Sequence, residues 1–172
     1  NQNGSSMVSK INLSTGQPVK EGALTYKQQL DASKFGEGIA IIGDELFQLT
    51  WKNQQCFVYD LKTFQLKREL AYTGEGWGLC SDGKQLIMSD GTERLTFKDP
   101  KTFQTLRTLE VYSDQGPLPQ LNELEYIDGL IYANIYTTNF IAVIEPTLGR
   151  VIALIDAGNL VAAGKGNGEV LN

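Results

Sequence analysis

The sequence predicts an all-β protein, a β-propeller built from four-stranded antiparallel blades. Three observations favour this fold class. Two sets of segments repeat along the chain in the same phase, Gly and Asp pairs separate short apolar runs within each repeat, and no amphipathic helix is evident. The 172 residues are 41% hydrophobic and 20% charged, which is a globular composition long enough to form one core.

The first repeated feature is a short apolar strand that ends in a turn carrying Asn, Asp or Glu. It occurs four times, with the polar residue at Asn12, Asp60, Asp99 and Glu145. These positions are 39 to 48 residues apart, which is close to the length of a propeller blade. Asn and Asp suit such turns because their side chains accept hydrogen bonds from nearby backbone N–H groups.

The second repeated feature is an apolar strand that leads through a tight turn into the next strand. Gly-Asp or Asp-Gly pairs lie at residues 43–44, 82–83 and 128–129, and such pairs between apolar runs are strong hairpin signals. Each repeat thus contains four strands, as expected of a blade. Tandem hairpins could also form a sandwich, but the regular period favours the propeller.

The repeats predict a single domain, residues 1–172, that contains about three and a half blades. We predict a partial blade at 1–30, whole blades at about 37–71, 77–111 and 122–155, and a tail at 156–172. A closed propeller needs roughly four blades or more. We therefore expect the chain to be incomplete at both ends.

Charge and residue types exclude several function classes. The net charge is −5, and without a Lys/Arg cluster the chain is a poor candidate for binding nucleic acid or an anionic membrane. The absence of His excludes His-based nucleophilic triads and His-rich zinc sites. Cys56 and Cys80 are expected to be buried strand residues. We expect no metal ion or other cofactor.

The phase of the repeat also predicts a site. Equivalent positions of a packed repeat meet equivalent surroundings, and the inner strands of a propeller converge on its central channel. One such position holds Glu37, Trp77 and Asn122, and a second holds Trp51, Gly91 and Tyr136. If both positions face the axis, they form an aromatic pocket with a carboxyl and an amide group, as in many small-molecule sites.

Glu37 is the candidate proton-transfer group of this pocket. Its two glycine neighbours leave room for a substrate, and burial beside Trp51 and Trp77 would raise the pKa of its carboxyl toward neutrality. Asn122 can donate and accept hydrogen bonds at once. Three structural alternatives stay open: the indoles pack between blades, Glu37 is solvated at a hairpin mouth, or Asn122 caps a turn.

Two further carboxylates, Glu123 and Glu125, follow Asn122 closely. We expect one of them to point to solvent and the other to line the channel. The sequence does not indicate which is which.

At these residues the sequence resembles the plant- and bacterial-type glutaminyl-peptide cyclotransferases, also called glutamine cyclotransferases or glutaminyl cyclases. The matching stretches are Phe35–Gly38, Leu49–Lys52, Gly76–Leu79, Met88–Gly91, Leu121–Tyr126 and Ala133–Ile135. The resemblance implies a five-bladed propeller that works without zinc. The family's opening strand, and its last blade with a Lys near the reacting carbonyl, have no counterpart in this sequence.

The resemblance implies an acyltransferase that converts the N-terminal Gln of peptides or proteins into pyroglutamate and releases ammonia. It implies Glu37 as the proton-transfer residue and substrate contacts from Phe35, Trp51, Trp77, Asn122 and Tyr136. Tyr136 stands where the family carries Trp, which keeps an aromatic wall and adds a hydroxyl group. A secreted or periplasmic location is implied by the family alone. The alternative function is a truncated, non-catalytic propeller that binds peptides or proteins.

Overall fold

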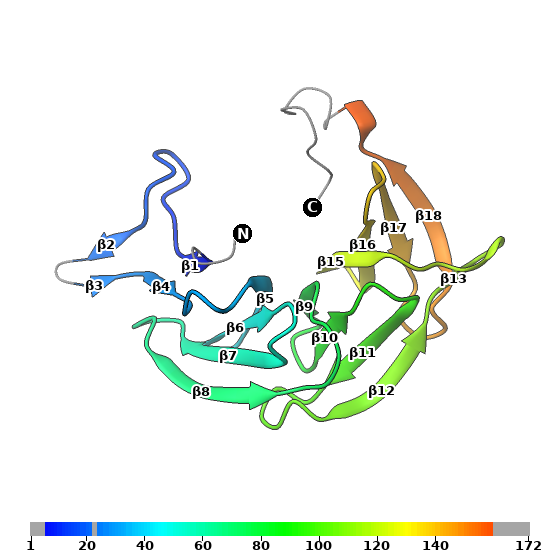
Figure 1. Ribbon diagram of the computed structural model, residues 1–172. Coiled ribbons are helices and arrows are strands. Elements are labelled where there is room, and N and C mark those ends of the chain that lie inside the picture. The colour runs from blue at the N-terminus through cyan, green and yellow to red at the C-terminus, as the bar shows by residue number, and fades with distance from the viewer. Residues whose placement is uncertain (1–5, 22–23, 160–172) are drawn as a thin grey trace.

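Three four-stranded antiparallel sheets make up most of the computed structural model, which describes residues 6–21 and 24–159 (Figure 1). The first sheet contains β5 (Gly36–Ile42), β6 (Glu45–Thr50), β7 (Gln55–Asp60) and β8 (Leu66–Ala71). The second contains β9 (Leu79–Ser81), β10 (Leu86–Ser89), β11 (Arg94–Lys98) and β12 (Thr105–Glu110). The third contains β15 (Leu121–Ile127), β16 (Leu130–Ile135), β17 (Phe140–Ile144) and β18 (Val151–Asp156). The prediction of four-stranded antiparallel blades is confirmed.

Six shorter strands pair outside these sheets. They are β1 (Met7–Ser9) with β4 (Lys27–Gln29), β2 (Lys20–Glu21) with β3 (Leu24–Thr25), and β13 (Tyr112–Ser113) with β14 (Gly116–Pro117). The last pair forms a hairpin within the connection between the second and third sheets. Most of the tail expected at 156–172 lies outside the described residues.

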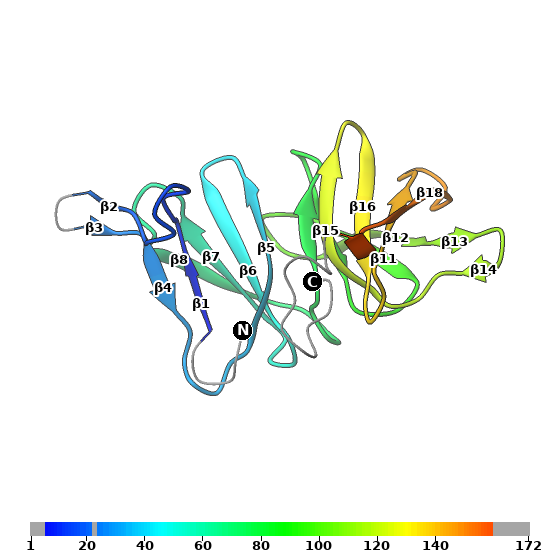
Figure 2. The ribbon, with the colours of Figure 1, turned by 90° about the horizontal axis from the view of Figure 1, so that it is seen from above.

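The sheets are arranged as an open arc of blades. Strands β5, β9 and β15 lie side by side along the inner side of the arc, and β8, β12 and β18 lie at its rim (Figure 1). The view turned by 90° shows the β5–β6 and β15–β16 hairpins pointing the same way (Figure 2). The residues at the ends of β5, β9 and β15 are therefore close to one another on the inner side of the arc.

Apolar side chains between neighbouring sheets hold the blades together. One cluster joins the first two sheets through Phe47, Leu49, Val58, Leu79, Leu86 and Phe103. A second joins the second and third sheets through Ile87, Leu95, Phe97, Leu121, Ile131 and Ile144. Cys56 and Cys80 are buried, unpaired members of these clusters, as expected. Burial raises the pKa of both thiols, which leaves them unreactive core residues.

The repeated turns form as the sequence predicts. The side-chain oxygens of Asn12, Asp60 and Asp99 each accept hydrogen bonds from the backbone N–H groups two and three residues later, at 2.8–3.2 Å. Glu145 does the same in the last repeat. The polar residue at the repeat position is therefore a turn residue in all four copies. Within the described residues no helix is long and apolar enough to span a membrane.

Candidate functional site

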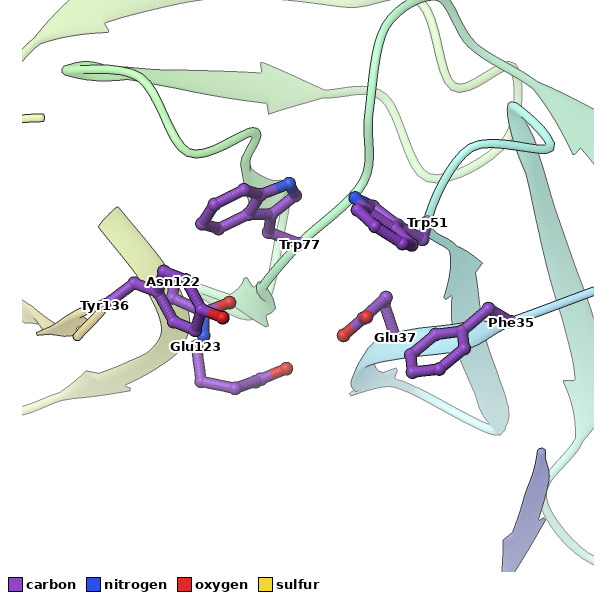
Figure 3. A pocket seen from close by; sticks show the side chains of 7 residues that line it. All are labelled: Phe35, Glu37, Trp51, Trp77, Asn122, Glu123 and Tyr136. Carbon is purple, nitrogen blue, oxygen red and sulfur yellow. The ribbon is translucent and has the colours of Figure 1, made fainter. Parts of the chain in front are cut away.

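The structure brings all six predicted site residues to one cavity of about 500 Å³ (Figure 3). Seven side chains line it: Phe35, Glu37, Trp51, Trp77, Asn122, Glu123 and Tyr136. They come from all three blades, and each lies on or beside the end of an inner strand or of the strand next to it. The remaining member of the second repeat position, Gly91, lies behind Trp77 rather than in the lining.

Matching β-bulges aim the polar side chains into this cavity. On β5, Gly36 pairs with Thr50 and Ile39 pairs with Gln48, so one extra residue is accommodated around Glu37. On β15 the same shift between Leu121 and Leu124 falls at Asn122 and Glu123. A bulge interrupts the alternation of a strand and re-aims its side chains, which is why bulges recur beside active sites.

Glycines let the inner strands approach closely enough to share this cavity. The Gly38 N–H donates to the Trp77 carbonyl oxygen at 2.7 Å. A Cβ atom on Gly38 would lie 2.5 Å from the backbone nitrogen of Leu79, so any larger residue would push β5 and β9 apart. Gly78 lies in the same way directly against the backbone of Asn122.

Ser89, which is completely buried, ties two blades together behind the cavity. Its hydroxyl oxygen accepts a hydrogen bond from the Gly78 N–H at 2.8 Å and donates to the backbone carbonyl oxygen of Asn122 at 2.7 Å. The backbone of Asn122 is thereby fixed relative to the second blade. This role is structural.

Edge-to-face ring contacts form the aromatic walls. Phe35 and Trp51 have ring centroids 5.9 Å apart, and Trp77 and Tyr136 have centroids 5.4 Å apart. The Trp77 ring lies against Gly91, where φ is +82° and an added Cβ would come within 2.6 Å of the indole. Only glycine satisfies both the backbone angle and the space at that position.

Burial among these rings changes the acidity of the two cavity carboxyl groups. Desolvation raises the pKa of Glu37 from 4.5 to about 7. Desolvation and then the charge of Glu37 raise the pKa of Glu123 to about 7 as well. Both carboxyl groups point into the cavity from opposite sides (Figure 3). A carboxyl group with a pKa near 7 can both accept and donate a proton at neutral pH.

The structure also answers what the sequence left open about Glu123 and Glu125. Glu123 lines the cavity, whereas Glu125 is exposed. A further carboxylate, Glu75, was missed by sequence reasoning. Its Oε2 atom accepts a hydrogen bond from Trp51 Nε1 at 2.6 Å and from Trp77 Nε1 at 2.9 Å. Glu75 lies in a connection outside both repeated features, so the repeat carried no signal for it.

The polar groups of the cavity do not form a metal centre. Across residues 6–21 and 24–159, no group of three or more His, Cys, Asp or Glu side chains is placed to hold a metal ion. The polar side chains that line the cavity are two carboxyl groups, one carboxamide and one phenol.

Comparisons with known proteins show what the whole chain is similar to. Residues 1–172 match the family model described as glutamine cyclotransferase. Glutaminyl-peptide cyclotransferase of Arabidopsis thaliana is 35% identical over 153 residues, which are 88% of this chain and 46% of that protein. The crystal structure of Myxococcus xanthus glutaminyl cyclase matches with a TM-score of 0.84 at 36% identity, over 96% of this chain and 68% of that one. The chain thus spans about half the length of the Arabidopsis relative.

Proposed function

The chain belongs to the glutamine cyclotransferase family, and from this premise we propose that its cavity converts the N-terminal Gln of a peptide into pyroglutamate. The observation that carries the proposal is a carboxyl group with a pKa of about 7 that faces an aromatic cavity of about 500 Å³. That volume suits a single side chain or small ligand. The sequence-based expectation of the family and of its propeller fold is confirmed.

The reaction is an intramolecular acyl transfer. The α-amine of the N-terminal Gln attacks the carbon of its own γ-carboxamide, so a C–N bond forms and the ring closes. The bond from that carbon to the amide nitrogen then breaks. One proton moves from the attacking amine to the leaving nitrogen, and ammonia departs. No oxidant, reductant or second substrate is required.

Glu37 is the group proposed to move that proton. In its ionised form it takes the proton from the attacking amine, and in its protonated form it gives the proton to the leaving nitrogen. A pKa near the working pH makes both half-steps accessible. Positioned acid–base groups of this kind contribute about 10²- to 10⁴-fold to a rate.

The other cavity residues are proposed to hold the substrate curled. Ring closure requires the amine and the carboxamide carbon of one Gln to meet, and a tight apolar enclosure favours that compact conformation. Trp51 and Trp77 form two of its walls, and Phe35 and Tyr136 extend them. The side chain of Asn122 is suited to bind an amide group of the substrate, because a carboxamide both donates and accepts.

Glu123 is proposed as a second acidic group of the reaction. Two carboxyl groups that share one cavity resist double ionisation. One of them therefore keeps a proton near neutral pH while the other acts as the base. This arrangement would supply a proton donor and a proton acceptor at the same time.

The experiment is release of ammonia from a peptide that begins with Gln, measured on the protein with its natural ends. We expect turnover by the wild type and by Glu125→Gln, which removes an exposed charge from the same strand as Glu123. Glu37→Gln is expected to lower kcat/KM by about 10²- to 10⁴-fold. An N-acetylated peptide should not react because its nitrogen is no longer a nucleophile. Equal turnover by wild type and Glu37→Gln would reject the catalytic role.

The same experiment separates catalysis from simple peptide binding. A protein that binds the Gln-initiated peptide without releasing ammonia would support the non-catalytic alternative.

A secreted or periplasmic location is also part of the proposal and rests on the family alone. Recovery of the native protein only in the cytoplasmic fraction of its source cells would overturn that part.

A further inference from the structure

We propose that Glu75 is a positioning residue that fixes the two indole walls of the cavity, Trp51 and Trp77, at a set distance and orientation. Glu75 does not line the cavity and touches no reacting atom in this proposal. Its consequence for catalysis rests on the proposed cyclotransferase function. The geometric claim stands on the structure independently of that function.

One carboxylate oxygen serves both indoles. Glu75 Oε2 accepts from Trp51 Nε1 at 2.6 Å and from Trp77 Nε1 at 2.9 Å. The two indole nitrogens accordingly point toward each other in Figure 3. Hydrogen bonds to an ionised acceptor are roughly twice as strong as neutral ones. These bonds lower the pKa of Glu75 below its ordinary value, so the acceptor is ionised at neutral pH.

The two walls belong to different blades. Trp51 directly follows β6 of the first sheet, and Trp77 lies two residues before β9 of the second. Glu75 lies in the connection between β8 and β9. By binding both indoles, it couples the positions of the two walls across a blade boundary, and it adds a side-chain link to the backbone hydrogen bond from the Gly38 N–H to the Trp77 carbonyl oxygen.

Lys52 contacts both Trp51 and Glu75. Its Nζ atom lies 4.0 Å from the centroid of the Trp51 ring and 3.7 Å from Glu75 Oε1. The ammonium group therefore covers one face of Trp51 and balances the charge of the carboxylate. The Lys52 and Glu75 side chains are 61% and 39% exposed, so solvent screens the ion pair, and the indole hydrogen bonds are the main geometric constraint.

The two hydrogen bonds to Glu75 constrain the indoles in a way that their ring contacts do not. Each indole also makes one edge-to-face contact, Trp51 with Phe35 and Trp77 with Tyr136. A ring contact of that type leaves the indole free to tilt, whereas a hydrogen bond at Nε1 fixes its orientation. Because ring closure depends on how tightly the Gln side chain is curled, a small displacement of either wall lowers the rate steeply.

The test uses the fact that the chain has two Trp residues. In ¹⁵N-labelled protein their indole N–H groups give two separate NMR signals, both at positions typical of hydrogen-bonded indoles. We expect Glu75→Gln and Glu75→Ala to shift both signals toward the values of free indole, with the larger shift in the Ala variant. The matched control is Glu69→Gln, which removes the same charge from an exposed position on β8 and should shift neither signal.

The kinetic readout is the division of the effect between kcat and KM for a Gln-initiated peptide. We expect Glu75→Ala to lower kcat by about 100-fold, with a smaller loss in the nearly isosteric Gln variant and little change in KM. A shift of one indole signal or of neither, or an unchanged kcat when both signals move, would overturn the proposal. If wild-type protein shows no turnover, the proposed function fails while the NMR result still decides whether Glu75 holds both indoles.

Discussion

Replacing Glu37 with Gln is expected to stabilise the folded protein at alkaline pH while it removes the proposed activity. The reason is that the cavity holds an ionisable group in surroundings that disfavour its charge. A site of this kind lowers the stability of the fold that carries it. The size of this loss of stability follows from the difference between the pKa values of Glu37 in the folded and the unfolded protein.

Burial raises the pKa of Glu37 from 4.5 in an unfolded chain to about 7 in the folded protein. Between these values the folded state binds more protons than the unfolded state, so stability falls as the pH rises from 4.5 to about 7. Each pKa unit corresponds to about 1.4 kcal/mol. With partial screening at the cavity mouth, ionised Glu37 destabilises the folded state by about 2–3 kcal/mol at about pH 8. Gln is neutral throughout and lacks this effect.

The assay is urea unfolding followed by far-ultraviolet circular dichroism at about pH 5 and about pH 8. We expect Glu37→Gln to be more stable than wild type by about 2–3 kcal/mol at the higher pH and within about 1 kcal/mol of it at the lower pH. Glu125→Gln, at an exposed position, should match wild type at both. Equal stability of Glu37→Gln and wild type at the higher pH would refute the reasoning, because a solvated carboxylate carries no such penalty.

Three further substitutions test two glycine or serine contacts behind the cavity and one ion pair at the far end of the first blade. Gly38→Ala should lower the free energy of unfolding in urea by about 2–4 kcal/mol, because its Cβ would collide with the backbone of β9. Ser89→Ala should cost about 1–3 kcal/mol in the same assay and weaken peptide binding, because it removes the hydrogen bond that fixes the Asn122 carbonyl. Glu45, whose pKa the Arg68 hydrogen bond holds at about 2, stabilises the fold above its ordinary pKa. This contribution is lost as the pH falls toward 2, so the Tm of wild type should drop more than that of Glu45→Gln during acidification.

The blades could be predicted from the sequence because their turns carry a local chemical signature. Asp60 and Asp99 bind the backbone of their own turns, and that requirement recurs in every copy whatever the rest of the strand contains. Residues at the same offset within each repeat then occupy equivalent positions in space, although the repeats themselves are 39 to 48 residues apart. This is why Glu37, Trp77 and Asn122, which are far apart in the chain, could be assigned to one cavity from the sequence.

The finer geometry of the site depends on local irregularities that the repeat does not encode. The bulge on β15 breaks the strict alternation of that strand, so counting positions could not separate Glu123 from Glu125. Gly36 and Gly38 on either side of Glu37 were a usable signal, since glycine inside a strand often marks a bulge. Glu75 left no comparable signal, because its partners are brought to it only by the packing of two blades.

The most direct test of the proposed proton transfer is to measure the pKa of the Glu37 carboxyl group by ¹³C NMR. Its carboxyl signal is followed as the pH changes and is assigned by its loss in Glu37→Gln. The raised pKa predicts a midpoint near 7, well above the ordinary value of 4.5 for this carboxyl group. A midpoint for Glu37 close to 4.5 would show that the aromatic cavity does not exclude water from this group. Glu37 would then be ionised throughout the neutral range, and it could not donate the proton that the leaving nitrogen requires.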